Sequence, residues 1–190
     1  MIITIARECG CYGDEIGQII AKQLKIPLYN KKALTKLAEE KGVLERYPDY
    51  LGEKSAGTML SVIAEDDGEE SVVHKIPAKA LKELIQEESF VLIGRAGNYA
   101  FRNDKNAVRV FLSGEKEARI AHLMETHKIS KREAKALIEK TESRRKEYHT
   151  YYTGESWGYA ANYDLCINDT RFGIEGTAEI ILKYVQECEA

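Results

Sequence analysis

The chain opens with an apolar segment, a glycine turn and an amphipathic helix in direct succession. Residues 2–6 (Ile-Ile-Thr-Ile-Ala) are typical of a short buried strand, and the residues that follow include Gly10 and Gly13. From about residue 14 to residue 25, apolar residues recur with helical spacing. In this order, backbone N–H groups and the positive end of a helix dipole meet at one point, which is typical of an anion site. We therefore expect a phosphate-binding turn near the beginning of the chain.

The rest of the chain continues to alternate strand-like and helix-like segments. We expect strands at residues 26–29, 90–93, 108–112 and 163–168, and helices at about 34–42, 77–88 and 174–185. Ser113 is the expected N-cap of one further helix, and Ser130 with Glu133 forms the expected capping box of another. The alternation predicts a three-layer α/β fold, in which a parallel sheet carries helices on both faces, as a single domain over residues 1–190.

Residues 43–75 interrupt this alternation. They have no regular period, and the acidic run at residues 65–70 favours a solvated loop. Beyond residue 142 the chain becomes polar and aromatic, and residues 142–163 lie outside the core pattern that we expect.

Composition limits the classes of partner. The chain is 44% hydrophobic and 31% charged, with a net charge of −3, so no overall attraction to nucleic acid or to an anionic membrane is expected. Phosphate affinity must therefore come from local basic groups. No apolar run approaches the roughly 20 residues of a membrane span, and the N-terminus lacks signal-peptide features, so we expect a cytoplasmic protein with no membrane partner.

The cysteines at positions 9, 11, 166 and 188 do not have the spacing of a zinc site or of a disulfide framework. Four free thiols are the favoured interpretation, with a redox-sensitive pair at Cys9 and Cys11 as the alternative. The histidines at positions 74, 122, 127 and 149 form no metal-binding pair of suitable spacing. The sequence predicts no metal site built by protein side chains.

Three segments follow apolar strands, namely residues 7–15, 94–99 and 168–173. In open α/β sheets, ligands bind outside the carboxyl ends of the strands, so we expect these segments to converge on one site. Arg7 and Glu8 are placed either for use in that site or for pairing with each other. Arg95 offers a planar guanidinium that suits phosphate, and a structural salt bridge is the alternative.

Arg144, Arg145 and Lys146 precede a series of tyrosines and Trp157. Basic and aromatic residues together favour a segment that holds or covers a nucleotide. They also suit single-stranded nucleic acid, although the net negative charge argues against that partner. A surface loop whose tyrosines pack at its base is the third interpretation.

Several of these segments resemble motifs of one family. Residues 6–17 read Ala-Arg-Glu-Cys-Gly-Cys-Tyr-Gly-Asp-Glu-Ile-Gly, and residues 26–30 read Ile-Pro-Leu-Tyr-Asn. Residues 91–99 contain the Gly-Arg motif, and residues 144–158 contain two arginines, a Tyr-Tyr-Thr-Gly stretch and Trp-Gly. With residues 162–168 (Asn-Tyr-Asp-Leu-Cys-Ile-Asn), this pattern resembles the cytidylate kinase-like family of nucleoside monophosphate kinases over nearly the whole chain.

The resemblance implies a P-loop kinase core that uses ATP and Mg²⁺ and phosphorylates a nucleoside monophosphate such as CMP. It further implies an acceptor-side insertion near residues 43–88 and a lid-like segment near residues 130–158. The implied catalytic residues are Arg7, Arg144 and Arg145. The implied phosphate-binding residues are Glu8, Cys9, Gly10, Cys11, Tyr12, Gly13, Asp14 and Glu15, and the implied acceptor-binding residues are Tyr29, Asn30 and Arg95.

The glycine turn departs from a standard phosphate-binding loop. Asp14 and Glu15 follow Gly13, where such a loop has a lysine and a hydroxyl residue. Cys11 and Tyr12 replace small residues, and Asn30 replaces a common aspartate. Two functions remain open: a phosphotransferase that uses arginines in place of the lysine, and a nucleotide-binding or sensing protein of the same fold that has lost catalysis.

Overall fold

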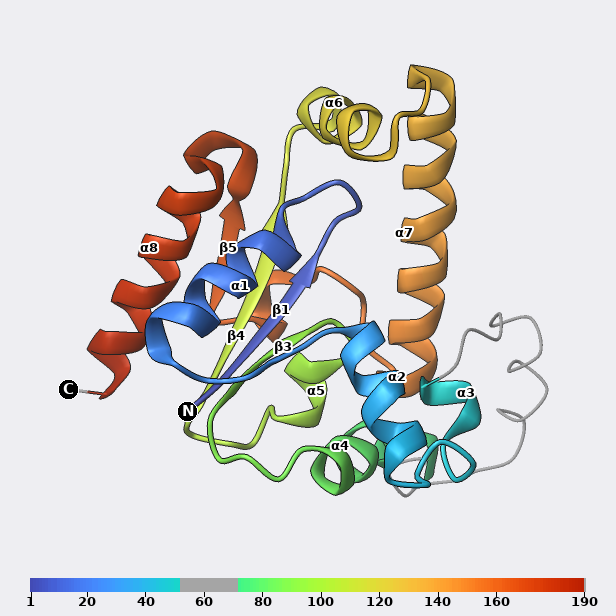
Figure 1. Cartoon of the computed structure of the whole chain (residues 1–190), viewed down its shortest axis with the longest axis vertical. Helices are drawn as coiled ribbons and strands as arrows, with labels where there is room; N and C mark the ends of the chain where they lie inside the picture. The colour runs from blue at the N-terminus through green and yellow to red at the C-terminus, as the bar shows by residue number, and fades with distance from the viewer. Residues whose placement is uncertain (52–71, 190) are drawn as a thin grey trace.

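The structure is a computed structural model that describes residues 1–51 and 72–189. Its centre is a parallel sheet with the strand order β2-β3-β1-β4-β5 (Figure 1). The strands are β1 (Ile2–Arg7), β2 (Leu28–Tyr29), β3 (Phe90–Ile93), β4 (Ala107–Ser113) and β5 (Leu165–Asn168). In the register of the central strands, Ile5 lies beside Ile93 on one side and Val110 on the other. The carboxyl ends of β1, β3 and β4 therefore lie along one edge.

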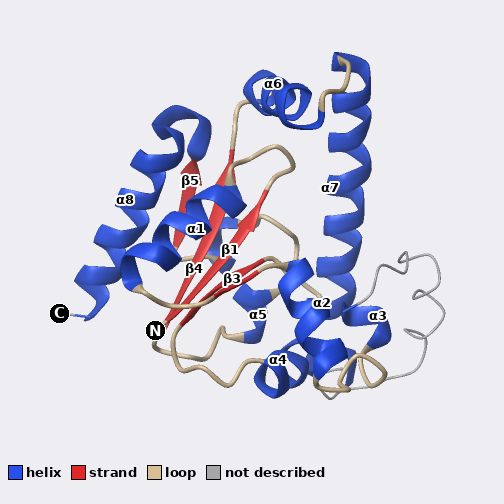
Figure 2. Ribbon diagram, in the orientation of Figure 1, coloured by secondary structure: helices blue, strands red, loops and turns tan. Residues whose placement is uncertain are grey.

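Helices cover both faces of this sheet (Figure 2). They are α1 (Gly13–Leu24), α2 (Lys31–Glu40), α3 (Pro48–Leu51), α4 (Val72–Leu84), α5 (Gly97–Ala100), α6 (Lys116–His127), α7 (Lys131–Thr153) and α8 (Asp169–Glu189), with a 3₁₀ turn at Ala160–Asn162. The predicted three-layer α/β fold is confirmed. Among the described residues, we find no helix with both the length and the apolar character needed to cross a bilayer.

Each face has its own hydrophobic core. Against one face, Ile16 and Ile20 of α1 pack with Ile181 and Val185 of α8. Against the other face, α2, α4, α5 and the C-terminal part of α7 form a second core, in which Leu81, Leu84, Leu92, Tyr50 and Tyr152 are buried. A third, smaller cluster places α6 and α7 on the glycine turn, where Cys9 contacts apolar residues of both helices.

One expectation about a helix boundary is wrong and another is confirmed. Ser113 is the last residue of β4, and its hydroxyl donates a hydrogen bond to the carbonyl of Ile167 at 3.4 Å, so it caps no helix. Helix α6 begins after Glu115, which makes no side-chain cap. The expected capping box at Ser130 and Glu133 is present at the start of α7.

The polar and aromatic residues after position 142 were not expected to be helical, yet α7 continues to Thr153 and ends at Gly154, which has φ +70°. Residues 43–75 contain α3 and the first turns of α4, whereas the acidic run at 65–70 lies outside the described residues.

Candidate functional site

Three segments from different parts of the chain meet at the carboxyl edge of the sheet. The N–H of Gly94 donates to the carbonyl of Ile5 at 2.9 Å, and a Cβ placed on Gly94 would lie 2.9 Å from Nη1 of Arg7. From the third segment, Asp169 accepts a hydrogen bond from the N–H of Tyr12 at 2.8 Å. The three segments that follow strands thus converge at the carboxyl edge, as expected for a parallel sheet. They are residues 7–15, 94–99 and 168–173.

The glycine turn has a backbone conformation that only glycine adopts easily. Gly10 has φ +90°, and a Cβ at this position would approach the carbonyl oxygen of Arg119 to 2.7 Å. Tyr12, the N-cap residue of α1, makes no side-chain cap. The first N–H groups of α1 therefore stay directed at the turn, and the positive end of the helix dipole favours an anion there.

Carboxylates already bind several N–H groups in and beside this turn. The N–H of Cys9 donates to Glu142 Oε1 at 3.3 Å, and the N–H of Tyr12 donates to Asp169 Oδ2. Glu8 is turned aside, since its Oε2 accepts from the N–H of Gly114 at 3.1 Å. The turn is therefore a place where oxyanions bind, and an incoming phosphate has to compete with protein carboxylates for it.

Burial raises the pKa values of two acidic groups beside the glycine turn. Asp169 is fully buried, and burial raises the pKa of its carboxyl, while the hydrogen bond from Tyr12 opposes that shift. Burial and the nearby Asp169 carboxylate also raise the pKa of the Cys11 thiol. All four cysteines are free, and Cys9 and Cys11 are buried.

Arg119 of α6 holds the glycine turn in place through hydrogen bonds. This residue was not among the site residues expected from the sequence. Its Nη1 donates to the carbonyl of Cys9 at 2.9 Å and to Glu142 Oε1 at 2.6 Å, while its Nε donates to the carbonyl of Gly114 at 3.0 Å. The side chain is 8% exposed. The sequence holds one sign of this role: Arg119 lies four residues before Leu123, on the apolar face of its helix. A charged residue on a buried face is expected to be paired.

The two arginines of the lid-like segment point in different directions. Arg145 is partly buried, and its Nη1 donates to the carbonyl of Arg7 at 2.7 Å. Burial, together with the charge of Arg7, lowers the pKa of Arg145 to about 10. Arg144 is the preceding residue of the helix and is exposed. Of the two neighbouring arginines, Arg145 is the one that contacts the first residue of the segment 7–15.

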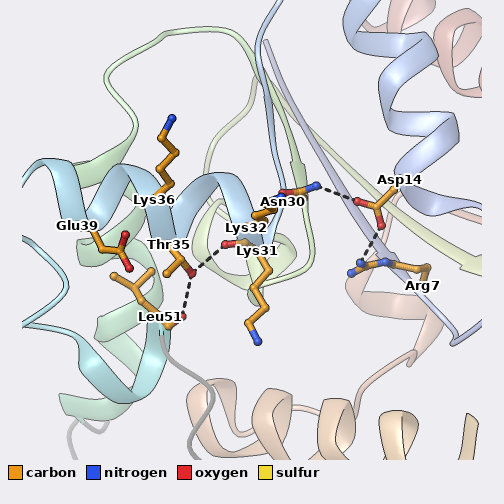
Figure 3. A pocket seen from close by; sticks show the side chains of 9 residues that line it. All are labelled: Arg7, Asp14, Asn30, Lys31, Lys32, Thr35, Lys36, Glu39 and Leu51. Atoms are coloured by element: carbon orange, nitrogen blue, oxygen red, sulfur yellow. Dashed lines mark hydrogen bonds and ion pairs between the residues drawn. The ribbon is translucent and has the colours of Figure 1, made fainter. Parts of the chain in front are cut away.

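A cavity of about 710 Å³ opens beside the turn, towards α2 (Figure 3). Its lining residues are Arg7, Asp14, Asn30, Lys31, Lys32, Thr35, Lys36, Glu39 and Leu51. Figure 3 shows Asp14 between Arg7 and Asn30, with oxygen–nitrogen distances of 3.3 and 3.2 Å. Asn30 also caps α2, because its Oδ1 accepts from the N–H of Ala33 at 3.0 Å. Cationic side chains outnumber carboxylates in this lining, so the cavity suits a phosphate-bearing ligand.

The other expected acceptor residues lie beside the cavity rather than in its lining. Arg95 donates to the carbonyls of Tyr50 at 2.6 Å and Leu51 at 3.1 Å, and it has φ +57°. Its guanidinium thus holds the short helix α3, whose last residue, Leu51, lines the cavity. The hydroxyl of Tyr29 donates to Glu87 at 2.8 Å, and burial and this contact raise its pKa to about 12.

The tyrosines of α7 pack with one another and with α3. The ring of Tyr152 lies 4.8 Å from that of Tyr148, 4.9 Å from that of Tyr151 and 5.2 Å from that of Tyr50. Trp157 stacks edge-on against Phe111 at 5.4 Å. The tyrosine rings belong to the core at the C-terminal end of α7, whereas Tyr159 is 62% exposed.

Within residues 1–51 and 72–189, no three His, Cys, Asp or Glu side chains are grouped so as to hold a metal ion.

Comparisons with known proteins identify the family of this chain. A cytidylate kinase from Archaeoglobus fulgidus is 27% identical over 98% of this chain and 95% of its own length. The crystal structure of an uncharacterized protein from Eubacterium ventriosum superposes with a TM-score of 0.75 and 27% identity, covering 98% of both chains. The shikimate kinase from Bacteroides thetaiotaomicron, at 13% identity and a TM-score of 0.52, has a similar fold over 98% of each chain. The cytidylate kinase-like family matches residues 2–171, so the chain belongs to the cytidylate kinase-like family.

Proposed function

We propose that the protein is a nucleoside monophosphate kinase that transfers the terminal phosphoryl group of ATP to a nucleoside monophosphate such as CMP. The observation that carries this proposal is the position of Arg7. Its carbonyl is held by Arg145 at the glycine turn, and its guanidinium lines the cation-rich cavity beside Asp14. One residue therefore joins a site for donor phosphates to a site for an acceptor phosphate.

The donor phosphates would bind the N–H groups of residues 8–15, where the carboxylates of Glu142 and Asp169 now accept hydrogen bonds. Arg7, Arg119 and Arg145 supply the positive charge that a loop lysine supplies elsewhere. An oxygen of the acceptor phosphate attacks the terminal phosphorus while the bond to the bridging oxygen of ADP breaks, and positive charge stabilises this transfer.

Mg²⁺ fits this site only with help from the substrate. Magnesium ions in phosphoryl-transfer sites are bound by one or two carboxylates together with substrate phosphates and water. Asp14 is the carboxylate that would hold it, since its side chain is 44% exposed and faces the cavity. There the ion would neutralise charge on the phosphates.

The direct test is ADP formation from ATP and Mg²⁺ with a panel of nucleoside monophosphates, including CMP, UMP, AMP and GMP. We expect turnover with at least one pyrimidine monophosphate. Binding of ATP without turnover with any acceptor would contradict the proposal and identify a nucleotide-binding protein.

The neighbouring arginines of α7 give a matched pair of variants. We expect Arg145→Gln to lower kcat by about 100-fold, because it removes a charge next to the transferred group. Arg144→Gln is expected to have a much smaller effect, since Arg144 is exposed. Equal losses in the two variants would show that the lid-like segment binds substrate in a different arrangement.

A further inference from the structure

A second cavity lies away from the site described above. It has a volume of about 440 Å³ and is formed by α4, the end of α5 and the loop that leads into β4. Its lining residues are His74, Lys75, Ala78, Lys79, Lys82, Ala100, Phe101, Arg102, Asn103, Asp104 and Lys105. Because the loop precedes the first residue of β4, this cavity lies at the amino-terminal edge of the sheet (Figure 1). The glycine turn follows β1 at the opposite edge.

Cationic side chains dominate this lining. Three lysines come from α4, and Arg102 and Lys105 come from the loop, whereas Asp104 is the one carboxylate among the lining residues. That carboxylate is engaged within the loop, where its Oδ1 accepts from the N–H of Asn106 at 2.9 Å. A local excess of positive charge in a chain of net charge −3 creates a potential that attracts anions.

Helix α4 supplies three of the lysines from one side. Lys75, Lys79 and Lys82 recur at intervals of four and three residues, so they share one side of the helix, although like charges at this spacing disfavour a helix slightly. Glu83 follows Lys79 by four residues, so it borders this face, and it forms an ion pair with Arg46. The carboxylate of Glu83 is therefore engaged by Arg46, as that of Asp104 is engaged within its own loop.

The arginine of the cavity is held in a defined orientation. The guanidinium of Arg102 lies 3.7 Å from the centroid of the Tyr99 ring, and its Nη1 donates to the carbonyl of Tyr99 at 2.9 Å. A planar guanidinium flanked by lysines combines the two side chains that bind phosphate groups best. The volume also lies within the range of small-molecule sites, which is about 300–1,000 Å³.

We propose that this cavity binds an oligophosphate chain, from either a nucleoside triphosphate or inorganic oligophosphate, independently of the site at the glycine turn. Several point charges spread along one helix face favour a ligand whose negative charges are also spread along a chain. A single small dianion such as sulfate would contact only part of this face.

The test is calorimetric titration of the full chain with inorganic triphosphate in the absence of Mg²⁺. The wild-type protein is compared with Lys79→Gln/Lys82→Gln and with the control pair Lys22→Gln/Lys183→Gln, which removes the same charge from exposed positions on α1 and α8. We expect the first pair to weaken one class of sites by about tenfold or more, since two charges that contact the ligand are lost. The control pair should bind as the wild type does.

Equal affinities in the two pairs would overturn the proposal, and so would equal competition by sulfate at matched ionic strength. Arg145→Gln separates the two sites, because it should weaken only binding at the glycine turn. If all triphosphate binding is lost in Arg145→Gln, the cavity binds no oligophosphate. Titration with ATP identifies the source: tighter binding than triphosphate at the cavity supports a nucleotide, and equal or weaker binding supports the inorganic chain.

Discussion

The C-terminal turns and the middle of helix α7 contact the rest of the molecule through different chemistry. The C-terminal turns form an aromatic cluster in which ring contacts join Tyr50, Tyr148, Tyr151 and Tyr152. In the middle of the helix, Glu142 and Arg145 bind the glycine turn through charge-assisted hydrogen bonds. Figure 1 shows α7 passing beside the sheet from α6 to α3, so both contacts belong to one element.

This difference leads to a prediction about helix α7. Aromatic packing does not depend on which anions are bound, so the tyrosine cluster anchors α7. The contacts of Glu142 and Arg145 involve groups that a phosphate would compete with or bind. We infer that donor binding rearranges the middle of α7 while its anchored end stays in place. The following predictions test this division, from the largest expected effect to the smallest.

Removing the anchor should have the largest effect. Tyr152 is 1% exposed, so Tyr152→Ala leaves a cavity in the aromatic cluster and should lower the free energy of unfolding by about 3–5 kcal/mol. Urea denaturation measures this change. Tyr159→Ala, at a ring that is 62% exposed, is the control and should stay within about 0.5 kcal/mol of the wild type. A small effect at Tyr152 would show that the cluster is no anchor.

Removing the brace of the glycine turn should rank second. Arg119→Ala leaves the carboxylates of Glu142 and Glu8 without their buried partner, and loss of one partner of a buried pair costs about 3 kcal/mol. The matched variant Arg46→Ala breaks an ion pair that is more exposed and should cost about 0–1 kcal/mol. Equal costs in urea denaturation would mean that Arg119 contributes no more than a surface ion pair.

Acid should weaken the anchored end of α7. Burial lowers the pKa of His149 to about 4, so in the folded state this ring stays neutral where the unfolded chain, with an ordinary pKa near 6.5, takes up a proton. The stability that it contributes is complete above pH 6.5 and is lost as the pH falls towards 4, by an amount on the order of 2–3 kcal/mol. Burial also raises the pKa of the nearby Glu155, and this shift acts in the opposite direction.

Urea denaturation between pH 7 and pH 4.5 measures this dependence. His149→Gln should flatten it, whereas the exposed His127→Gln should leave it unchanged. An identical pH dependence in the wild type and in His149→Gln would contradict the assignment.

The smallest effect concerns the competition at the glycine turn. Glu142→Gln keeps the side-chain shape but removes the charge that competes with phosphate, so ATP should bind about three- to tenfold more tightly. The control is Glu139→Gln, one turn earlier on the exposed side of α7. Calorimetric titration with ATP compares the two variants. Weaker binding in Glu142→Gln would mean that this carboxylate helps to hold the nucleotide.

The fold could be predicted because its strands are short apolar runs that end in glycine or charged residues. The expected strands at 2–6, 90–93 and 108–112 correspond to β1, β3 and β4 within two residues at each end. The C-terminal half of α7 was missed because its inward-facing residues are tyrosines next to charged residues, so no aliphatic period is visible. The spacing of Tyr148, Tyr151 and Tyr152 is nevertheless that of one helix face.

The candidate site could be predicted in outline, since the rule for strand ends brings residues 7–15, 94–99 and 168–173 together. The charge balance of the site could not be predicted, because the partners of Arg119 and Glu142 lie far away from them in the sequence. Nothing in the local sequence shows that Glu142 accepts a hydrogen bond from Cys9, or that Arg145 rather than Arg144 reaches Arg7. Whether the remaining expected site residues bind substrate stays a prediction.

The most direct test is a crystal structure of the full chain with a non-hydrolysable ATP analogue and Mg²⁺. We predict that phosphate oxygens bind the N–H groups of the glycine turn, that Glu142 no longer accepts from the N–H of Cys9, and that the tyrosine cluster is unchanged. An analogue bound elsewhere, with the hydrogen bond between Cys9 and Glu142 intact, would contradict it.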